Sequence, residues 1–148
     1  MKKVLIVDDQ KECILIMKMI LKQFPIKIIE ACNGEEALKK IRKYQPALAF
    51  LDIRMPMKNG IDVLKELQEQ GDKTAIVMVS DHRDEAIIDA CFDLGAMAYL
   101  KKPFSLRELN NVIKKLNLSD DDGKQESTSD DNVEKWDKEN SKTDGHIH

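Results

Sequence analysis

Residues 47–60 read ALAFLDIRMPMKNG and give the clearest indication of the fold. The first five residues of this stretch form a short apolar run, which predicts a buried strand that ends at Leu51. Asp52 follows this strand directly, and Pro56 and Gly60 shape the loop beyond it, where glycine permits backbone angles that are closed to other residues. The chain therefore places a carboxylate at the carboxyl end of a buried strand.

Short apolar runs alternate with longer segments of helical period through the first 118 residues, which is the pattern of a parallel sheet covered by helices. Ser105, followed three residues later by Glu108, is a capping box that starts the last helix. The sequence predicts an α/β fold of five βα units with a five-stranded, doubly wound parallel sheet. The predicted strands are residues 3–7, 27–31, 47–51, 75–79 and 98–101, and the predicted helices are about 11–24, 35–44, 61–70, 84–94 and 105–116.

The composition changes after residue 118. Residues 1–118 carry 20 Lys+Arg and 17 Asp+Glu, a net charge of +3, whereas residues 119–148 carry 4 and 10, a net charge of −6. The last 30 residues hold three sizeable apolar side chains, too few to offset the entropy of ordering the segment. We expect one globular domain over residues 1–118 and an acidic, mostly disordered tail over residues 119–148.

The composition also limits the classes of partner. Lys and Arg are not clustered with aromatic residues, so no nucleic-acid partner is expected. No apolar run approaches the roughly 20 residues that span a bilayer, so we expect a soluble, cytoplasmic protein with no membrane partner. Cys13, Cys32 and Cys91 are widely spaced and are predicted to be small buried apolar groups in a reducing compartment.

Reactive side chains follow four of the predicted strands. Asp8 and Asp9 follow the first strand, Asp52 the third, Ser80 the fourth and Lys102 the fifth. The carboxyl ends of parallel strands meet at one edge of a sheet, where ligands bind. Grouped carboxylates suit Mg²⁺, while a lysine and a hydroxyl suit phosphoryl oxygens. A single aspartate here would more often cap a helix, but that explanation does not cover five positions, so a phosphoryl site is predicted.

Four motifs, in this order and spacing, resemble the receiver family of response regulators over residues 1 to about 118. They are VLIVDDQ (4–10), LAFLDIRMPMKNG (48–60), IVMVS (76–80) and GAMAYLKKPF (95–104). The resemblance implies a flavodoxin-like (βα)5 receiver fold. It also implies that Asp52 takes a phosphoryl group from a phosphohistidine with the help of Mg²⁺ and that the protein then changes conformation.

The resemblance assigns further roles to individual positions. Asp9, Asp52 and the backbone carbonyl of Arg54 would bind Mg²⁺, and Asp8 would hold a metal-bound water. These four residues are the metal set that the family pattern implies.

The catalytic set is Asp52, Lys102 and Ser80 on the same grounds. Lys102, rather than Lys101, matches the lysine of the family because it directly precedes a proline. Ser80 and Tyr99 match the pair of residues that moves when the phosphoryl group is present.

Three positions depart from the commonest family pattern or are variable in it. Asp81 stands where the family usually has a small residue, and His82 follows it. Together with Arg54, these residues are predicted to form the rim of the site. An extra carboxylate here could alter metal affinity and the rate of phosphorylation. His82 is interpreted as an exposed loop residue in preference to a catalytic histidine.

The first predicted helix is unusually apolar. Residues 13–21 read CILIMKMIL, eight apolar residues out of nine, whereas a helix that packs on one face of a sheet needs a stripe about 100° wide. We predict that Cys13, Ile14, Met17 and Leu21 dock a histidine kinase or a histidine phosphotransfer protein. The alternative is a generously buried helix.

The tail is too short and polar for a DNA-binding output domain, so the sequence is interpreted as a stand-alone receiver that signals to a downstream relay or effector protein. It is not expected to be an enzyme, beyond assisting its own phosphorylation and dephosphorylation. One alternative is a phosphate-independent pseudo-receiver, which only Asp81 supports. Another is an aspartate-nucleophile phosphatase of the haloacid dehalogenase type. That family needs a second aspartate two residues after the nucleophile, where this chain has Arg54 after Asp52 and Gln10 after Asp8.

Overall fold

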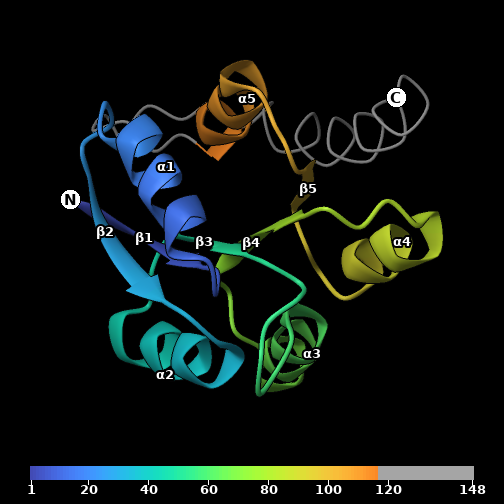
Figure 1. Ribbon diagram of the computed structural model, residues 1–148. Coiled ribbons are helices and arrows are strands. Elements are labelled where there is room, and N and C mark those ends of the chain that lie inside the picture. The colour runs from blue at the N-terminus through green and yellow to red at the C-terminus, as the bar shows by residue number, and fades with distance from the viewer. Residues whose placement is uncertain (117–148) are drawn as a thin grey trace.

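Five parallel strands form one sheet in the computed structural model, which describes residues 1–116 (Figure 1). The strand order is β2-β1-β3-β4-β5, so the chain winds outward from β1 in one direction and then in the other. The predicted doubly wound α/β fold is therefore confirmed, while the prediction for residues 119–148 lies outside the described residues. The strands are β1 (Lys2–Val7), β2 (Ile26–Ala31), β3 (Leu48–Leu51), β4 (Ala75–Ser80) and β5 (Ala98–Lys101).

Helices cover both faces of this sheet (Figure 1). α1 (Lys11–Leu21) and α5 (Leu106–Leu116) pack on one face, and α2 (Gly34–Tyr44), α3 (Gly60–Gln70) and α4 (Glu85–Asp93) pack on the other. Successive residues of a strand point to opposite faces, so Val4 and Ile6 join the core under α1 and α5. Leu5 and Val7 join the core under the other three helices. Burial on both faces explains why the strands are continuous apolar runs.

The predicted boundaries agree closely with the structure except at the end of α1, which is Leu21 rather than residue 24. Pro25 disfavours helical backbone angles in the residue before it. The Phe24 amide instead donates to the Leu21 carbonyl at 3.0 Å in a turn. The predicted capping box is confirmed, because the Glu108 amide donates to Ser105 Oγ at 3.0 Å and the Ser105 amide donates to Glu108 Oε1 at 2.8 Å.

Three of the four residues predicted to form the docking surface of α1 are buried, so the prediction is wrong for them. Ile14, Met17 and Leu21 are 6%, 4% and 0% exposed, because they form the stripe that packs on the sheet. Cys13 is partly exposed. Because eight of the nine residues from 13 to 21 are apolar, the sequence pattern does not show which stripe of the helix faces the core. The surplus apolar side chains on the outside of α1 are Leu15, Ile16 and Met19, which are 58%, 54% and 67% exposed.

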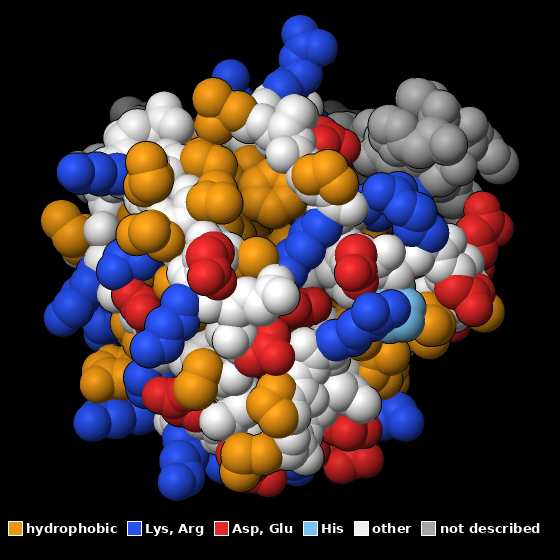
Figure 2. All heavy atoms as spheres, viewed as in Figure 1, with side chains coloured by type: hydrophobic (Ala, Val, Ile, Leu, Met, Phe, Trp, Pro, Cys, Tyr) orange, Lys and Arg blue, Asp and Glu red, His pale blue; other side chains and the backbone are white. Residues whose placement is uncertain are grey.

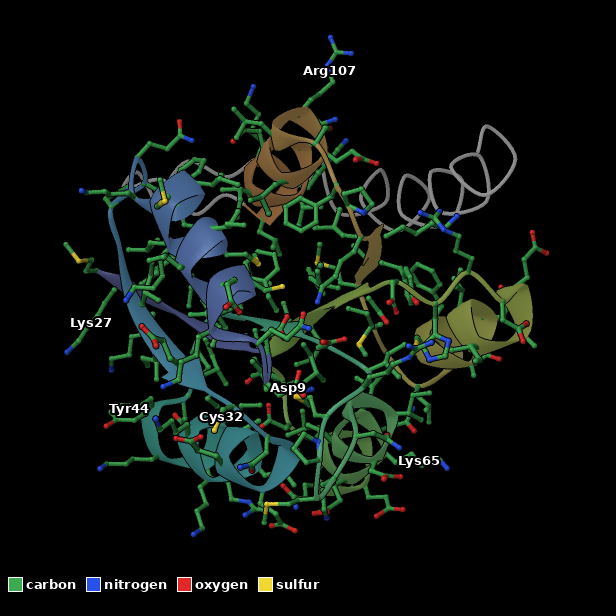
Figure 3. All side chains as sticks on the ribbon, in the orientation of Figure 1. Asp9, Lys27, Cys32, Tyr44, Lys65 and Arg107 are labelled. Carbon is green, nitrogen blue, oxygen red and sulfur yellow. The ribbon has the colours of Figure 1, made fainter. Side chains whose placement is uncertain are left out.

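The cysteines also differ from the prediction. Cys91 is buried in α4 as expected, but Cys32 is exposed. Cys32 lies just beyond β2, an edge strand that is covered by a neighbour on one side only, and it lies beside the start of α2 (Figure 3). Its amide donates to Glu36 Oε1 at 2.9 Å. Among residues 1–116, no helix has the length and apolar character needed to cross a membrane.

Candidate functional site

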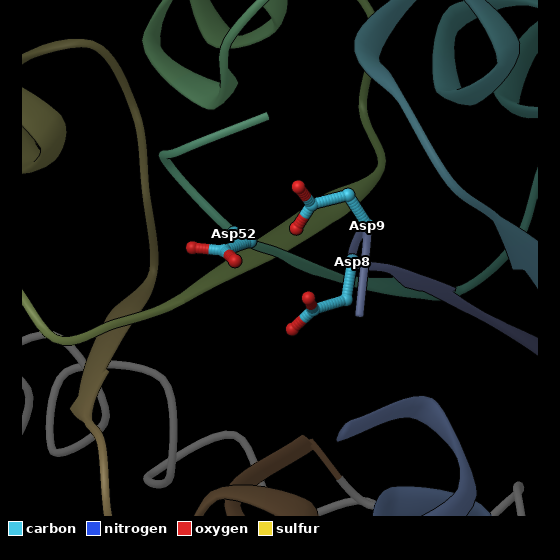
Figure 4. A group of neighbouring side chains, drawn as sticks. All are labelled: Asp8, Asp9 and Asp52. Carbon is cyan, nitrogen blue, oxygen red and sulfur yellow. The ribbon is translucent and has the colours of Figure 1, made fainter. Parts of the chain in front are cut away.

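Three carboxylates converge at the carboxyl ends of β1 and β3. These strands are neighbours, and Val7 pairs with Leu51 at their last residues, so the next residues emerge side by side. Carboxylate oxygens of Asp8, Asp9 and Asp52 lie within 4.8 Å of one another (Figure 4). Asp8 and Asp52 are buried, and Asp9 is exposed. The clustering predicted from the strand ends is confirmed.

Lys102 brings a positive charge to this cluster from the end of β5. Its Nζ atom lies 2.8 Å from Asp8 Oδ2 and 3.3 Å from Asp52 Oδ2. Lys101, by contrast, is a buried residue of β5 itself. The peptide bond between Lys102 and Pro103 is cis. Three carboxylates and one ammonium leave a net charge of −2, which one divalent cation would balance.

Burial and these neighbours raise the pKa values of both Asp52 and Lys102, which favours the neutral form of Asp52 and the charged form of Lys102. Burial raises the pKa of Asp52 to about 6, and the charge of Asp8 adds to this effect while Lys102 opposes it. Burial acts to lower the pKa of Lys102, but the hydrogen bond to Asp8 and the charge of Asp52 outweigh burial and raise it. Lys102 therefore stays charged at neutral pH, and the Asp52 carboxylate benefits from any further cation beside it.

Ser80 and Tyr99 are joined through the backbone of His82. Ser80 is fully buried at the end of β4, and its Oγ atom accepts a hydrogen bond from the His82 amide at 3.3 Å. The buried Tyr99 of β5 donates its hydroxyl to the His82 carbonyl at 2.9 Å. Burial raises the pKa of Tyr99, so its hydroxyl keeps its proton. The two predicted switch residues thus hold the same short segment after β4.

The three predicted rim residues contact one another at the mouth of the site. Arg54 Nε donates to His82 Nε2 at 3.2 Å and lies 3.8 Å from Asp81 Oδ1. Asp81 therefore pairs with Arg54, and it is not a member of the acidic cluster found among residues 1–116. The side chains of Arg54 and Asp81 are more than half exposed, as expected of a rim.

The loop between Asp52 and α3 differs from the prediction in one respect. Gly60 has no positive φ angle; instead, a Cβ atom there would lie 2.2 Å from the Asp52 carbonyl oxygen, so glycine is needed for close approach. The positive φ, 73°, belongs to Met57. The Lys58 amide donates to the Pro56 carbonyl at 2.8 Å and closes a γ-turn around Met57. Methionine carries no signal for this conformation, so the sequence did not reveal it.

An apolar pocket of about 560 Å³ adjoins the acidic cluster on the side of α1 and α5. Figure 2 shows hydrophobic side chains gathered on this side of the molecule, above the carboxylates. Cys13 lines the pocket and lies 3.7 Å from Lys102 Nζ, so it borders the site. Burial, with the charge of Asp8, raises the pKa of the Cys13 thiol. Apolar lining residues include Ile16, Ile20 and Phe104.

Comparison with known proteins agrees with this geometry. The family model described as the response regulator receiver domain matches residues 4–114. The alkaline phosphatase synthesis transcriptional regulatory protein PhoP of Bacillus subtilis is 37% identical over 113 residues, which are 76% of this chain and 47% of PhoP. Sporulation initiation phosphotransferase F of the same organism is 28% identical over 114 residues, which are 77% of this chain and 92% of that protein. The CheX-CheY-BeF3-Mg²⁺ complex of Borrelia burgdorferi matches with a TM-score of 0.71 and 29% identity, over 76% of this chain and 87% of that one.

The chain therefore belongs to the response regulator receiver domain family, whose members are signalling proteins of two-component systems. It spans about half the length of PhoP. Because PhoP is a transcriptional regulatory protein, the expectation that this chain has no nucleic-acid partner is not supported.

Proposed function

We propose that Asp52 accepts a phosphoryl group from a phosphohistidine and that the protein changes conformation in response. The observation that carries this proposal is the bridge of Lys102 between Asp8 and Asp52, 2.8 and 3.3 Å away, in a cluster of three carboxylates. A lone cation among three carboxylates leaves a negative site that needs a divalent cation, and it supplies a point charge for a phosphoryl oxygen.

The residues present fit Mg²⁺. All candidate ligands are oxygens, the cluster retains two negative charges after Lys102 is counted, and Asp9 is exposed enough for waters to complete the shell. Asp9, Asp52 and the backbone carbonyl of Arg54 would hold the ion, with Asp8 bound to one of its waters. Bound Mg²⁺ would supply charge neutralisation on the transferring phosphoryl oxygens. The related CheY structure, which holds BeF3 and Mg²⁺, supports this assignment.

The remaining steps use side chains of this chain. A carboxylate oxygen of Asp52 attacks phosphorus and forms an acyl phosphate while the bond from phosphorus to the donor imidazole nitrogen breaks. The Lys102 ammonium, already 3.3 Å from Asp52 Oδ2, pairs with a phosphoryl oxygen. The Ser80 side chain then rotates so that its hydroxyl donates to another phosphoryl oxygen, and the hydrogen bond from the His82 amide to Ser80 Oγ is lost. Because Tyr99 also holds His82, the change reaches β5.

The donor would be a histidine kinase or a histidine phosphotransfer protein, and the phosphorylated form would act on a downstream relay or effector protein. The outer face of α1, with Leu15, Ile16 and Met19 exposed, is the surface we propose for the donor. It adjoins the apolar pocket beside Asp8 and Lys102, so a protein docked there would reach the acidic cluster.

Incubation with Mg²⁺ and acetyl phosphate, followed by intact mass measurement, tests the proposal. A stable added phosphoryl group that is absent in Asp52→Asn supports a receiver. Sustained phosphate release with no stable adduct favours the phosphatase alternative. No added mass and no turnover favours a phosphate-independent pseudo-receiver, whose original support from Asp81 is weakened by the contact of Asp81 with Arg54.

A further inference from the structure

The loop from residue 53 to residue 59, which follows Asp52 of the acidic cluster in the chain, carries a strained turn. Met57 has a φ of 73°, and the Lys58 amide donates to the Pro56 carbonyl at 2.8 Å across it. This region of backbone space is unfavourable for a residue with a side chain. Such a conformation persists only where its surroundings hold it in place. We therefore expect residues beside the turn to make the contacts that stabilise this conformation.

Lys58, the residue after the turn, makes these contacts. Its ammonium forms an ion pair with Glu66 of α3 and lies 3.7 Å from Glu35 Oε2 of α2. Glu66 is itself 3.7 Å from Arg42 Nη2 of α2. The Lys58 side chain is 23% exposed, so most of it is packed between these elements. Lys58 thus links the strained loop to two helices.

The backbone of Lys58 is also fitted closely to α2. A Cβ atom on Gly34, the first residue of α2, would lie 2.1 Å from the Lys58 carbonyl oxygen. The packing of α2 against the loop therefore leaves no room for a side chain at residue 34. Both the side chain and the main chain of Lys58 are held by α2, and the side chain is also held by α3.

The other end of the same loop is held by Asp52. The Arg54 amide donates to Asp52 Oδ1 at 3.3 Å, and the Gly60 amide donates to the Ile53 carbonyl at 2.9 Å. With its two ends held in this way, the loop has few ways to relax. The Arg54 peptide and residues 57 and 58 therefore belong to one short loop that is held at both ends.

We propose that Lys58 is a positioning residue for the divalent cation site. Its ion pairs with Glu35 and Glu66 hold the strained turn, and the turn in turn sets the backbone carbonyl of Arg54 toward the acidic cluster. This inference rests on the proposed Mg²⁺ site and adds to it a residue that does not touch the ion. Residues that orient metal ligands without touching the ion commonly change the affinity for the metal by about tenfold or more when they are mutated.

Lys58→Met is the informative variant, since methionine keeps a long apolar stem and removes the charge. Titration of the full chain with Mg²⁺, followed by isothermal calorimetry or amide chemical shifts of Arg54 and Gly60, should show binding weakened by about tenfold. Lys58→Arg, which keeps the charge and can reach both glutamates, should restore affinity to within about twofold of the original protein.

Lys18→Met is the matched control. Lys18 pairs with Glu30 at 2.5 Å, also between two elements, but neither residue belongs to the loop after Asp52. We expect Lys18→Met to leave Mg²⁺ affinity unchanged. Equal affinity in Lys58→Met and the original protein, or an equal loss in Lys18→Met, would overturn the role of Lys58. If the original protein binds no Mg²⁺ at all, the proposed function fails, and the positioning role falls with it.

Discussion

One ammonium joins the loops after two different strands: Lys102 Nζ lies 2.8 Å from Asp8 Oδ2 and 3.3 Å from Asp52 Oδ2. These contacts hold the attacking carboxylate beside the charge that its product would need. Lys102→Met should therefore lower the rate of phosphorylation by acetyl phosphate, by about a hundredfold if Lys102 stabilises the transferring group as one preorganised donor does. Intact mass against time measures the rate. Retained Mg²⁺ binding in the variant would show that its site is folded, and an unchanged rate would remove Lys102 from the chemistry.

Asp52 makes folding stability depend on pH when no divalent ion is present. Burial raises its pKa from the ordinary 3.8 to about 6, so the folded state prefers the protonated carboxyl. The resulting stabilisation is fully present below about pH 4 and is lost as the pH rises through about 6. At pH 7 the charged carboxylate should cost at most about 3 kcal/mol, from roughly two pKa units at 1.36 kcal/mol each.

Asp52→Asn removes this charge at nearly constant volume. In metal-free buffer at pH 7 it should raise the free energy of unfolding by up to about 3 kcal/mol, and the gain should shrink toward pH 4. Urea unfolding at several pH values in the presence of a chelator measures both effects. Added Mg²⁺ should narrow the difference by stabilising the original protein more. A destabilised Asp52→Asn at pH 7 without metal would contradict the proposed cost of the charge.

The contacts of His82 with Ser80 and Tyr99 lead to a prediction about switching. A phosphoryl group shifts a two-state equilibrium only if it contacts one state better, and the Ser80 hydroxyl provides such a contact. Ser80→Ala should still be phosphorylated but should transmit less to Tyr99, because nothing then draws the His82 segment inward. Amide and ring chemical shifts near Tyr99, with and without phosphorylation, report this. A full response in Ser80→Ala would mean that another residue triggers the change.

The two faces of α1 separate docking from folding. Ile16→Asp or Met19→Asp changes an exposed position and should strongly reduce transfer from a phosphohistidine partner, because central apolar contacts commonly dominate interface energy. Acetyl phosphate needs no docking surface, so its reaction with Asp52 should be spared. Ile14→Asp and Met17→Asp place a charge in the core and should unfold the domain instead. Thermal unfolding and the two donors distinguish these cases, and equal loss with both donors in a folded Ile16→Asp would exclude the docking role.

Much of the fold and the central site could be predicted from the sequence, because both depend on strand ends. An apolar run followed by Asp52 or by Asp8 specifies where a strand stops, and parallel topology then brings the two residues together. The orientation of α1 could not be predicted in this way. Its apolar residues surround most of the helix, and only the sheet decides that Met17 is inside and Ile16 outside.

The contacts within the loops also could not be predicted from the sequence. Nothing in methionine indicates the positive φ of Met57, and the role of Gly60 depends on how closely it approaches the Asp52 carbonyl. The ion pairs of Lys58 require Glu35 of α2 and Glu66 of α3 to lie near the same ammonium, which depends on tertiary packing. Long-range contacts of this kind have no local sequence signal.

We expect the Arg54 side chain to control the access of water to the proposed acyl phosphate. Hydrolysis needs a water in line with phosphorus, and the Arg54 side chain stands at the mouth of the site, donating from Nε to His82 Nε2 at 3.2 Å and facing Asp81 at 3.8 Å. From there it can cover the approach of water and pair with a phosphoryl oxygen, and both effects slow attack.

Arg54→Ala should therefore hydrolyse faster than the original protein, by roughly tenfold if about 1.4 kcal/mol of protection is lost. Loss of phosphate from the purified phosphoprotein in Mg²⁺ buffer measures the rate. His82→Ala is the matched comparison, because it removes the side chain against which Arg54 rests but keeps the guanidinium. If protection comes from pairing with the phosphoryl oxygen, His82→Ala should change the rate much less than Arg54→Ala. If protection requires Arg54 to be held across the opening, the two variants should be similarly fast. An unchanged or slower rate in Arg54→Ala would remove Arg54 from the control of phosphoryl lifetime.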